Sequence, residues 1–170
     1  MLRVVEVTLE AAIPSGFDQS GGMSVEAILV GVSSSTNPIR VTMHTAAPRL
    51  LRGRASIPAK SYNAYIGMRC KQGYLACTMN TGELAQGARV QFMLSLCESV
   101  RFHVTGAITP GTTIGYSPAG FLAPVHSARI LADGLVVVEG IPDGLGVDVF
   151  GLTADQRTEA AEGKRTITVR

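Results

Sequence analysis

Short runs in which apolar and polar residues alternate occur along most of this chain. In Arg3 to Leu9, Gln91 to Leu96 and Val147 to Leu152 the apolar side chains fall at every second position, and this period of two predicts strands with one buried face. Further strands are predicted at Ser24 to Val32, Ile39 to His44, Tyr62 to Lys71, Tyr74 to Met79, Ser99 to Val104, Thr112 to Tyr116, Phe121 to Val125, Leu135 to Glu139 and Thr166 to Val169. Ten or more short strands in 170 residues predict an all-β fold, either a small barrel or a sandwich of short antiparallel strands.

One short surface helix is expected near the C-terminus, from Ala154 to Glu162. Thr153 and Gln156 have the spacing of a capping box, and Gly163 can end the helix in the left-handed conformation. Because this segment has few apolar residues, the helix is predicted to lie on the surface.

A chain of this length is expected to form a single β domain over residues 1–170. The composition and the length of the predicted strands change at about Val104, so the domain can also be divided into three parts. Residues 1–104 form a longer-stranded, basic half, residues 105–152 are rich in Gly and Pro and suit a small β-barrel, and residues 153–170 form a C-terminal arm.

The composition is unusually poor in charge for a lone domain. Of the residues, 46% are hydrophobic and 16% are charged, whereas about a quarter are charged in an average protein. This balance predicts that other subunits cover apolar surface, and hence self-association. The longest apolar runs are far shorter than the ~20 residues of a membrane-spanning helix, so no membrane contact is expected.

The three cysteines cannot form a complete set of disulfides. Cys70 and Cys77 flank a turn predicted at Gln72-Gly73, and a two-residue turn there would offset them from each other. We therefore predict small buried hydrophobic side chains rather than a disulfide.

Basic residues are segregated along the chain. From Ala27 to Gly82 there are seven basic residues and no acidic one, which leaves eight basic and thirteen acidic residues elsewhere. Such a block suits docking onto an acidic surface, whereas the alternative is a solvated loop whose acidic partners lie across the fold. Within the block, Pro48 to Arg54 interleaves cations with leucines, as an exposed contact segment would. The predicted partner-docking residues are Arg40, Arg49, Arg52, Arg54 and Lys60.

No catalytic or metal-binding pattern stands out. His44, His103 and His126 are scattered and lack zinc-site spacing with the cysteines. The segment Gly53 to Ser61 departs from the phosphate-binding loop, and no Gly-x-Ser-x-Gly motif occurs. We therefore expect no enzyme activity, cofactor or metal. With no Trp, four Tyr and five Phe, the chain also has few rings on which single-stranded nucleic acid could stack.

From Ile108 to Leu152, short β-prone runs alternate with Pro-Gly, Ala-Gly and Asp-Gly turns. The segment ends in a predicted hairpin in which Asp143-Gly144 supplies a turn with positive φ and Val147 and Val149 share a buried face. The spacing is carried by Pro110, Gly111, Ile114, Gly120, Gly144, Val147 and Val149. This pattern resembles the small β-barrel of phage head-decoration, or capsid cement, proteins. The chain departs from the family at Leu135 to Val138, which replaces a small Gly-x-Ala element, and upstream of the segment.

The resemblance implies a virion structural protein that binds and stabilises a phage head without doing chemistry. Its partners would be the major capsid protein lattice and other copies of itself, as in a trimer, and it would reside in a capsid assembled in the host cytoplasm. Two alternatives stay open. One is a shell-forming β-sandwich coat protein whose basic face meets nucleic acid, and the other is a small β-barrel hydrolase or ligand-binding domain.

Overall fold

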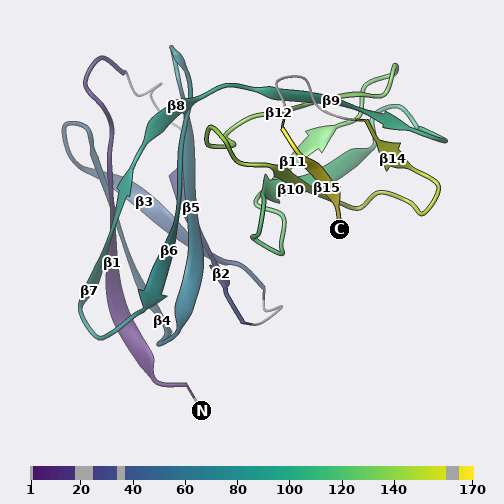
Figure 1. Ribbon diagram of the computed structural model, residues 1–170. Coiled ribbons are helices and arrows are strands. Elements are labelled where there is room, and N and C mark those ends of the chain that lie inside the picture. Colours follow the sequence, from purple (N-terminus) through teal and green to yellow (C-terminus); the bar gives the residue numbers. More distant parts are fainter. Residues whose placement is uncertain (1, 18–24, 34–36, 160–164) are drawn as a thin grey trace. The chain divides into compact units, whose positions relative to one another are not determined.

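The computed structural model describes residues 2–17, 25–33, 37–159 and 165–170. Within these ranges all regular secondary structure is β-strand, which confirms the predicted all-β class. The strands divide between two compact units, Met1–Leu96 and Cys97–Arg170 (Figure 1).

The first unit is built around one sheet. Its strands are β1 (Val4–Ala12), β2 (Val25–Gly31), β3 (Ile39–Ala47), β4 (Leu50–Pro58), β5 (Ser61–Cys70), β6 (Gly73–Glu83), β7 (Ala88–Met93) and β8 (Ser95–Cys97). They form an 8-stranded sheet in the order β7-β1-β4-β3-β2-β5-β6-β8. β7 and β8 lie at opposite ends of this order, and only Leu94 separates them along the chain. One extended segment therefore borders both β1 and β6, and the sheet is nearly closed into a barrel.

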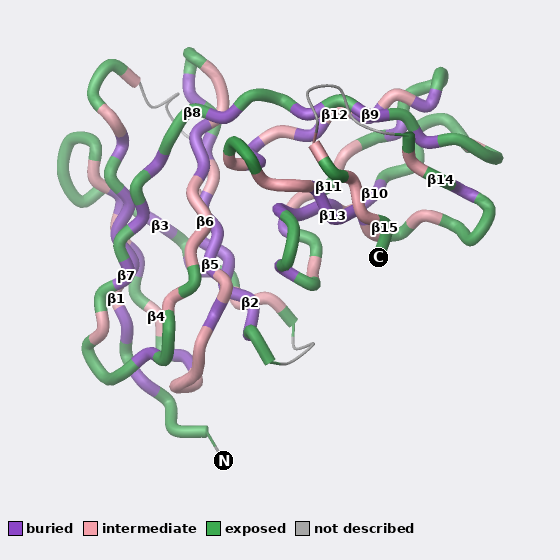
Figure 2. The backbone as a smooth tube through the Cα atoms, viewed as in Figure 1, coloured by how far each residue is buried: buried purple, intermediate pink, exposed green. Residues whose placement is uncertain are grey.

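Alternate side chains of these strands fill the barrel interior. On β1, Val5, Val7 and Leu9 are at most 2% exposed, as the period of two predicts. They belong to one continuous apolar core that also includes Leu29, Val41, Leu51, Ile66, Leu75 and Phe92. Figure 2 shows the resulting alternation of buried and exposed positions. Because burying each such side chain contributes roughly 1.5–3 kcal/mol, the interior holds this unit together and its outer face is left for polar residues.

The second unit is a pair of small sheets around a separate core. Its strands are β9 (Val100–Thr105), β10 (Thr113–Pro118), β11 (His126–Arg129), β12 (Leu135–Val138), β13 (Val147–Phe150), β14 (Arg157–Thr158) and β15 (Ile167–Val169). The sheets have the orders β11-β10-β13-β15 and β12-β9-β14. Both contribute to one core, with Phe102 and Val136 from the second sheet and Ile114 and Val149 from the first.

The described part of the predicted helix, Ala154 to Glu159, is not helical, and residues 160–162 lie outside the described ranges. The Thr153 amide does donate a hydrogen bond to Gln156 Oε1 at 2.8 Å, so one half of the capping box exists. It closes a single turn, after which β14 pairs with β9. Since the first turn of a helix is unfavourable to nucleate, long-range strand pairing satisfies this backbone instead. The predicted end at Gly163 lies outside the described residues.

One strand prediction is also wrong. Phe121 to Val125 is a loop, because Leu122 adopts a φ of 59° and Pro124 has no amide hydrogen for a ladder. Pro48 to Arg54, predicted to be an exposed contact segment, leads into β4, which pairs with β1 along its whole length. Arg52 and Arg54 therefore project from a strand inside the sheet order, whereas Arg49 precedes that strand.

The turn between β5 and β6 is Lys71-Gln72 rather than Gln72-Gly73. Cys70 and Cys77 consequently lie further apart along the ladder than the predicted register puts them. The cysteines are free, and Cys70 and Cys97 are buried as predicted. Burial raises the pKa of the half-buried Cys77 thiol, while a backbone hydrogen bond at Met93 lowers it by a smaller amount.

The predicted closing hairpin is right in its turn and wrong in its pairing. Gly144 has a φ of 84°, and the Leu145 amide donates to the Pro142 carbonyl across the turn at 3.2 Å. Val147 and Val149 are both fully buried in the core. However, β13 pairs with β10 and, in parallel, with β15, whereas β12 pairs with β9.

Candidate partner-docking site

β3 changes partners along its length. From Ile39 to Met43 it pairs with β2, and from His44 onward it pairs with β4. The β3–β4 ladder consists of His44 opposite Arg52, Thr45 opposite Leu51 and Ala47 opposite Leu50, with a bulge between Thr45 and Ala47. β4 continues to Pro58 against β1 alone. The two strands thus share a short ladder next to their connecting turn and separate beyond it.

Gly53 marks the point where the ladder stops. A Cβ atom at Gly53 would lie 2.7 Å from Met43 Sδ, 2.8 Å from the Thr42 carbonyl oxygen and 3.1 Å from Val41 Cγ1. Real Cβ atoms essentially never show the first two of these distances, and the third is unusually short. The missing side chain therefore allows the β3 backbone to cross close to β4 before the strands diverge.

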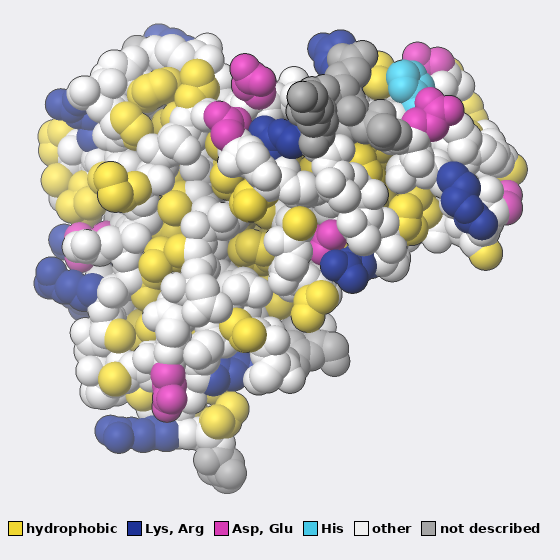
Figure 3. Space-filling model, viewed as in Figure 1, with side chains coloured by type: hydrophobic (Ala, Val, Ile, Leu, Met, Phe, Trp, Pro, Cys, Tyr) yellow, Lys and Arg dark blue, Asp and Glu magenta, His cyan; other side chains and the backbone are white. Residues whose placement is uncertain are grey.

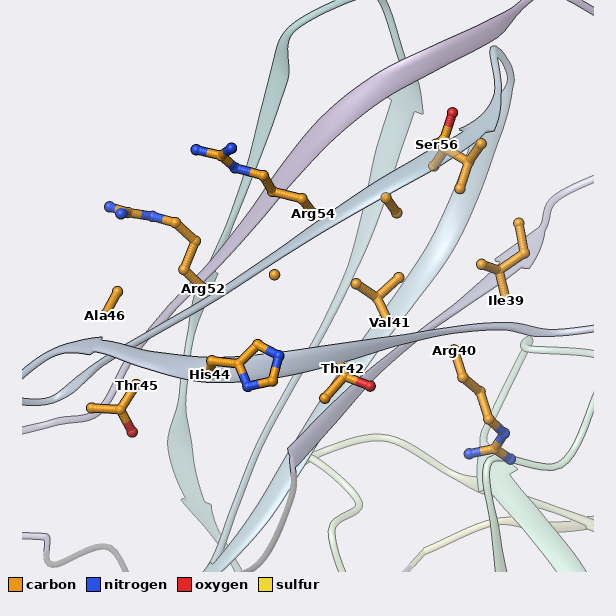
Figure 4. Close-up of a pocket in the computed structure, with 13 residues that line it drawn as sticks. Ile39, Arg40, Val41, Thr42, His44, Thr45, Ala46, Arg52, Arg54 and Ser56 are labelled. Carbon is orange, nitrogen blue, oxygen red and sulfur yellow. The ribbon is translucent and has the colours of Figure 1, made fainter.

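A cleft of about 770 Å³ opens where β3 and β4 diverge. Partly or fully buried apolar side chains form its inner side, namely Ile39, Val41, Ala55 and Ile57. Polar side chains from alternate positions form its outer side, namely Arg40, Thr42 and His44 of β3 and Arg52, Arg54 and Ser56 of β4. Figure 4 shows Arg52 and Arg54 extending from β4 in one direction and Arg40 extending from β3 in the other. No carboxylate is among the residues that line the cleft.

Two of the cleft arginines have acidic partners from outside the basic block. Arg40 Nη1 lies 3.3 Å from Glu26 Oε2, and both side chains are nearly half exposed. Arg52 Nη2 lies 3.5 Å from Glu10 Oε2, whose side chain is only 11% exposed. Glu10 also lies 3.7 Å from Arg89 on β7. The Arg40 pair is a weak, solvent-screened contact, whereas Arg52 neutralises a nearly buried carboxylate and has a structural role.

Arg54 differs from the other two. It stands opposite Thr8 in the β1–β4 ladder, and within the described part of the chain no hydrogen bond or ion pair involves its exposed guanidinium. Its five donors are therefore open to a partner.

The remaining two predicted docking residues lie at the ends of β4 and do not line the cleft. Arg49 is in the β3–β4 turn, with a φ of 58°, and its carbonyl accepts a hydrogen bond from the Ile13 amide at 2.9 Å. Lys60 is in the β4–β5 turn, where its Nζ lies 5.4 Å from the centre of the Tyr62 ring. Of the five predicted residues, Arg40, Arg52 and Arg54 thus line one cleft, whereas Arg49 and Lys60 do not.

His44 was not among the predicted docking residues, although the sequence carried a signal for it. The strand predicted from Ile39 to His44 alternates, so Arg40, Thr42 and His44 share the polar face of that strand. The cleft itself had no sequence signal, since it depends on which strands pair across the sheet.

The second unit holds a buried charge. Asp148 is fully buried, its Oδ2 accepts a hydrogen bond from the Gly120 amide at 3.1 Å and lies 3.3 Å from Arg170 Nε. Its Oδ1 and the hydroxyl of Ser117, which stands opposite Asp148 in the ladder, have no hydrogen-bond partner among the described residues. This arrangement fastens the C-terminal residue to β13.

Within the described ranges no three His, Cys, Asp or Glu residues gather as a metal site would require. The same part of the chain contains no helix that could cross a membrane. Comparisons with protein-family models, with curated proteins and with solved structures find no match to this chain. The β3–β4 cleft is therefore the candidate site, and its lining combines three arginines with an apolar inner side and holds no carboxylate.

Proposed function

We propose that the protein is a non-enzymatic virion subunit, a decoration or cement protein that binds and stabilises a phage head lattice. The resemblance of Ile108 to Leu152 to such proteins supplies the class of function. The proposed docking surface is supported by one observation. Arg40, Arg52 and Arg54 border one cleft, and no carboxylate is among the residues that line it. An acidic patch on the major capsid protein would be complementary to this surface.

Exposed apolar side chains support assembly with other subunits. Met93 is 83% exposed, Val4 59% and Leu2 55%. Figure 3 shows hydrophobic side chains spread over the visible face of the first unit rather than confined to its interior. Such surface favours contact with other copies or with a shell, so we expect a small oligomer, with a trimer as the leading arrangement.

Electron microscopy of the purified protein, alone and mixed with preformed heads, tests this function. A decoration protein should stay a small oligomer in isolation and cover the heads in a regular array. Closed particles formed by the protein alone would favour the shell-forming coat protein, whose basic face would then meet packaged nucleic acid. A stable monomer at high micromolar concentration that binds no head would overturn both roles.

A charge-reversal variant tests the docking face. Arg54→Glu should weaken attachment to heads, and attachment of the parent should fall as salt rises. Arg129→Glu is the matched control, because Arg129 is an exposed strand arginine of the second unit. Arg52 is unsuitable for this test, since its replacement would leave Glu10 without its closest cation. Equal attachment of both variants would place the docking face elsewhere.

A further inference from the structure

We propose that the cleft receives an extended acidic segment of the partner, which adds to the free edge of β4 as an extra strand. This inference rests on the proposed docking function and names the form of the ligand. It also predicts the pattern of the recognised segment, which alternates acidic and apolar residues.

The first argument is that two strand edges face the cleft. β3 from Ile39 to Met43 pairs only with β2, and β4 from Gly53 to Pro58 pairs only with β1. Among the described residues no backbone hydrogen bond joins these two stretches. In an antiparallel ladder every second residue turns its amide and carbonyl away from its partner strand. Both strands therefore present backbone donors and acceptors to the cleft, as receptors that bind peptides by strand addition do.

The second argument is that the cleft has two chemically different sides. Ala55 and Ile57 of β4 face inward, whereas Arg54 and Ser56 face outward. Side chains of an added strand alternate between the same two sides. Apolar residues of that strand would contact Ala55 and Ile57, and acidic residues would lie beside Arg54 on the outer side.

The third argument concerns direction. β3 and β4 are antiparallel to each other, so a strand between them must be antiparallel to one and parallel to the other. Antiparallel pairing is slightly more stable per residue, and β4 carries Arg54, the cleft arginine without an acidic partner among the described residues. The segment is therefore expected to run antiparallel to β4.

The test uses the full chain and a seven-residue peptide that alternates valine and glutamate. Isothermal titration should show binding, and cleft-facing amides of β4 beyond Gly53, from Arg54 to Ile57, should gain protection from hydrogen exchange. A lysine-for-glutamate peptide should not bind. The same valine–glutamate peptide with N-methyl groups on alternate residues, which keeps the charge and removes backbone donors, should bind at least tenfold more weakly.

Arg54→Glu should weaken peptide binding about tenfold, because it replaces an attractive cross-strand charge pair by a repulsive one. Arg129→Glu should leave peptide affinity unchanged. Equal binding of the N-methylated peptide, or binding without new amide protection, would overturn strand addition in favour of simple charge attraction. Binding of phosphate or citrate that excludes the peptide would assign the cleft to a small anion instead.

The outcomes separate this inference from the proposed function. If heads are decorated but no peptide binds, strand addition is wrong and the virion role stands. If the peptide binds with the expected protection but heads are not decorated, the cleft is a strand receptor for a different acidic partner.

Discussion

Replacing Gly53 by alanine should destabilise the first unit, although glycine is normally a poor strand residue. The new methyl carbon would lie 2.7 Å from Met43 Sδ and 2.8 Å from the Thr42 carbonyl oxygen. The sulfur can move, but the carbonyl belongs to β3, which β2 holds in place. Overpacking of this kind costs about 1–3 kcal/mol, and alanine recovers about 0.5–1 kcal/mol of strand propensity. The expected net loss is about 1–2 kcal/mol, and each kcal/mol shifts Tm by roughly 4–8 °C in a unit of this size.

Urea unfolding followed by tyrosine fluorescence measures this loss, because Tyr62, Tyr65 and Tyr74 lie in the first unit and only Tyr116 lies in the second. Ser56→Ala on the same strand is the control, and this exposed change should stay within about 0.5 kcal/mol of the parent. A Gly53→Ala protein as stable as the parent, or more stable, would show that β3 and β4 do not cross closely. A close crossing could then not be the reason why their ladder ends at this residue.

Three further predictions concern single contacts. Gly144→Val should lower the free energy of unfolding by about 1–3 kcal/mol and reduce the yield of soluble protein. A β-branched residue is strained at a φ of 84°, even though nothing would lie within 4 Å of its Cβ. A melting temperature equal to that of the parent would contradict this prediction. Arg170→Ala should lower the stability of the second unit by about 1–2 kcal/mol in thermal unfolding, because Asp148 loses its cation. If the contact is electrostatic, the same substitution should have little effect in a protein that already carries Asp148→Asn. Burial raises the pKa of Tyr62, whose hydroxyl donates to a backbone carbonyl at 2.9 Å. Its contribution to stability should therefore be complete below the usual tyrosine pKa near 10 and should be lost as pH rises through the higher folded value. Tyr62→Phe should flatten that alkaline decline in the free energy of unfolding, and an unchanged slope would exclude Tyr62 as its source.

Local alternation was enough to predict most strands, because a period of two depends only on neighbouring positions. β4 was missed although Leu51, Gly53, Ala55 and Ile57 all face inward. Two small residues in this set weaken the apolar signal, and the arginines between them make the segment look like an exposed basic loop. The period is present once glycine and alanine are counted as inward-facing residues.

The C-terminal helix shows why local signals can mislead. The Thr153 amide donates to Gln156 Oε1, which is one of the two hydrogen bonds of a capping box, whereas the Thr153 hydroxyl donates to Asp155 Oδ1, so the short-range prediction was half right. The conformation of the chain after that turn is decided by Thr105 and Val104 of β9, which pair with Arg157 and Thr158. The partner strand lies about fifty residues upstream in the sequence, and no local pattern indicates it.

The docking residues were predicted from the distribution of charge along the sequence. Folding changes which charges lie next to one another. Glu10 and Glu26 lie outside the acid-free block, yet they contact Arg52 and Arg40. A charge block read along the sequence is therefore partly neutralised in space, as the alternative interpretation expected. Arg54 is the cleft arginine for which the described residues provide no such partner, so it is the most informative position for mutation.

The cationic rim of the cleft explains how free strand edges can be tolerated on a protein that is poor in charge. Open edges invite pairing with identical chains, and proteins commonly prevent this with charged side chains beside the edge. If the free stretches of β4 from two copies met edge to edge, Arg54 of one copy would approach Arg54 of the other. The repulsion disfavours homotypic pairing, whereas an acidic strand meets attraction at the same position. Arg54 would thus both protect the edge and select its partner. The Arg54→Glu variant should therefore bind the acidic peptide about tenfold more weakly and bind basic strands more readily.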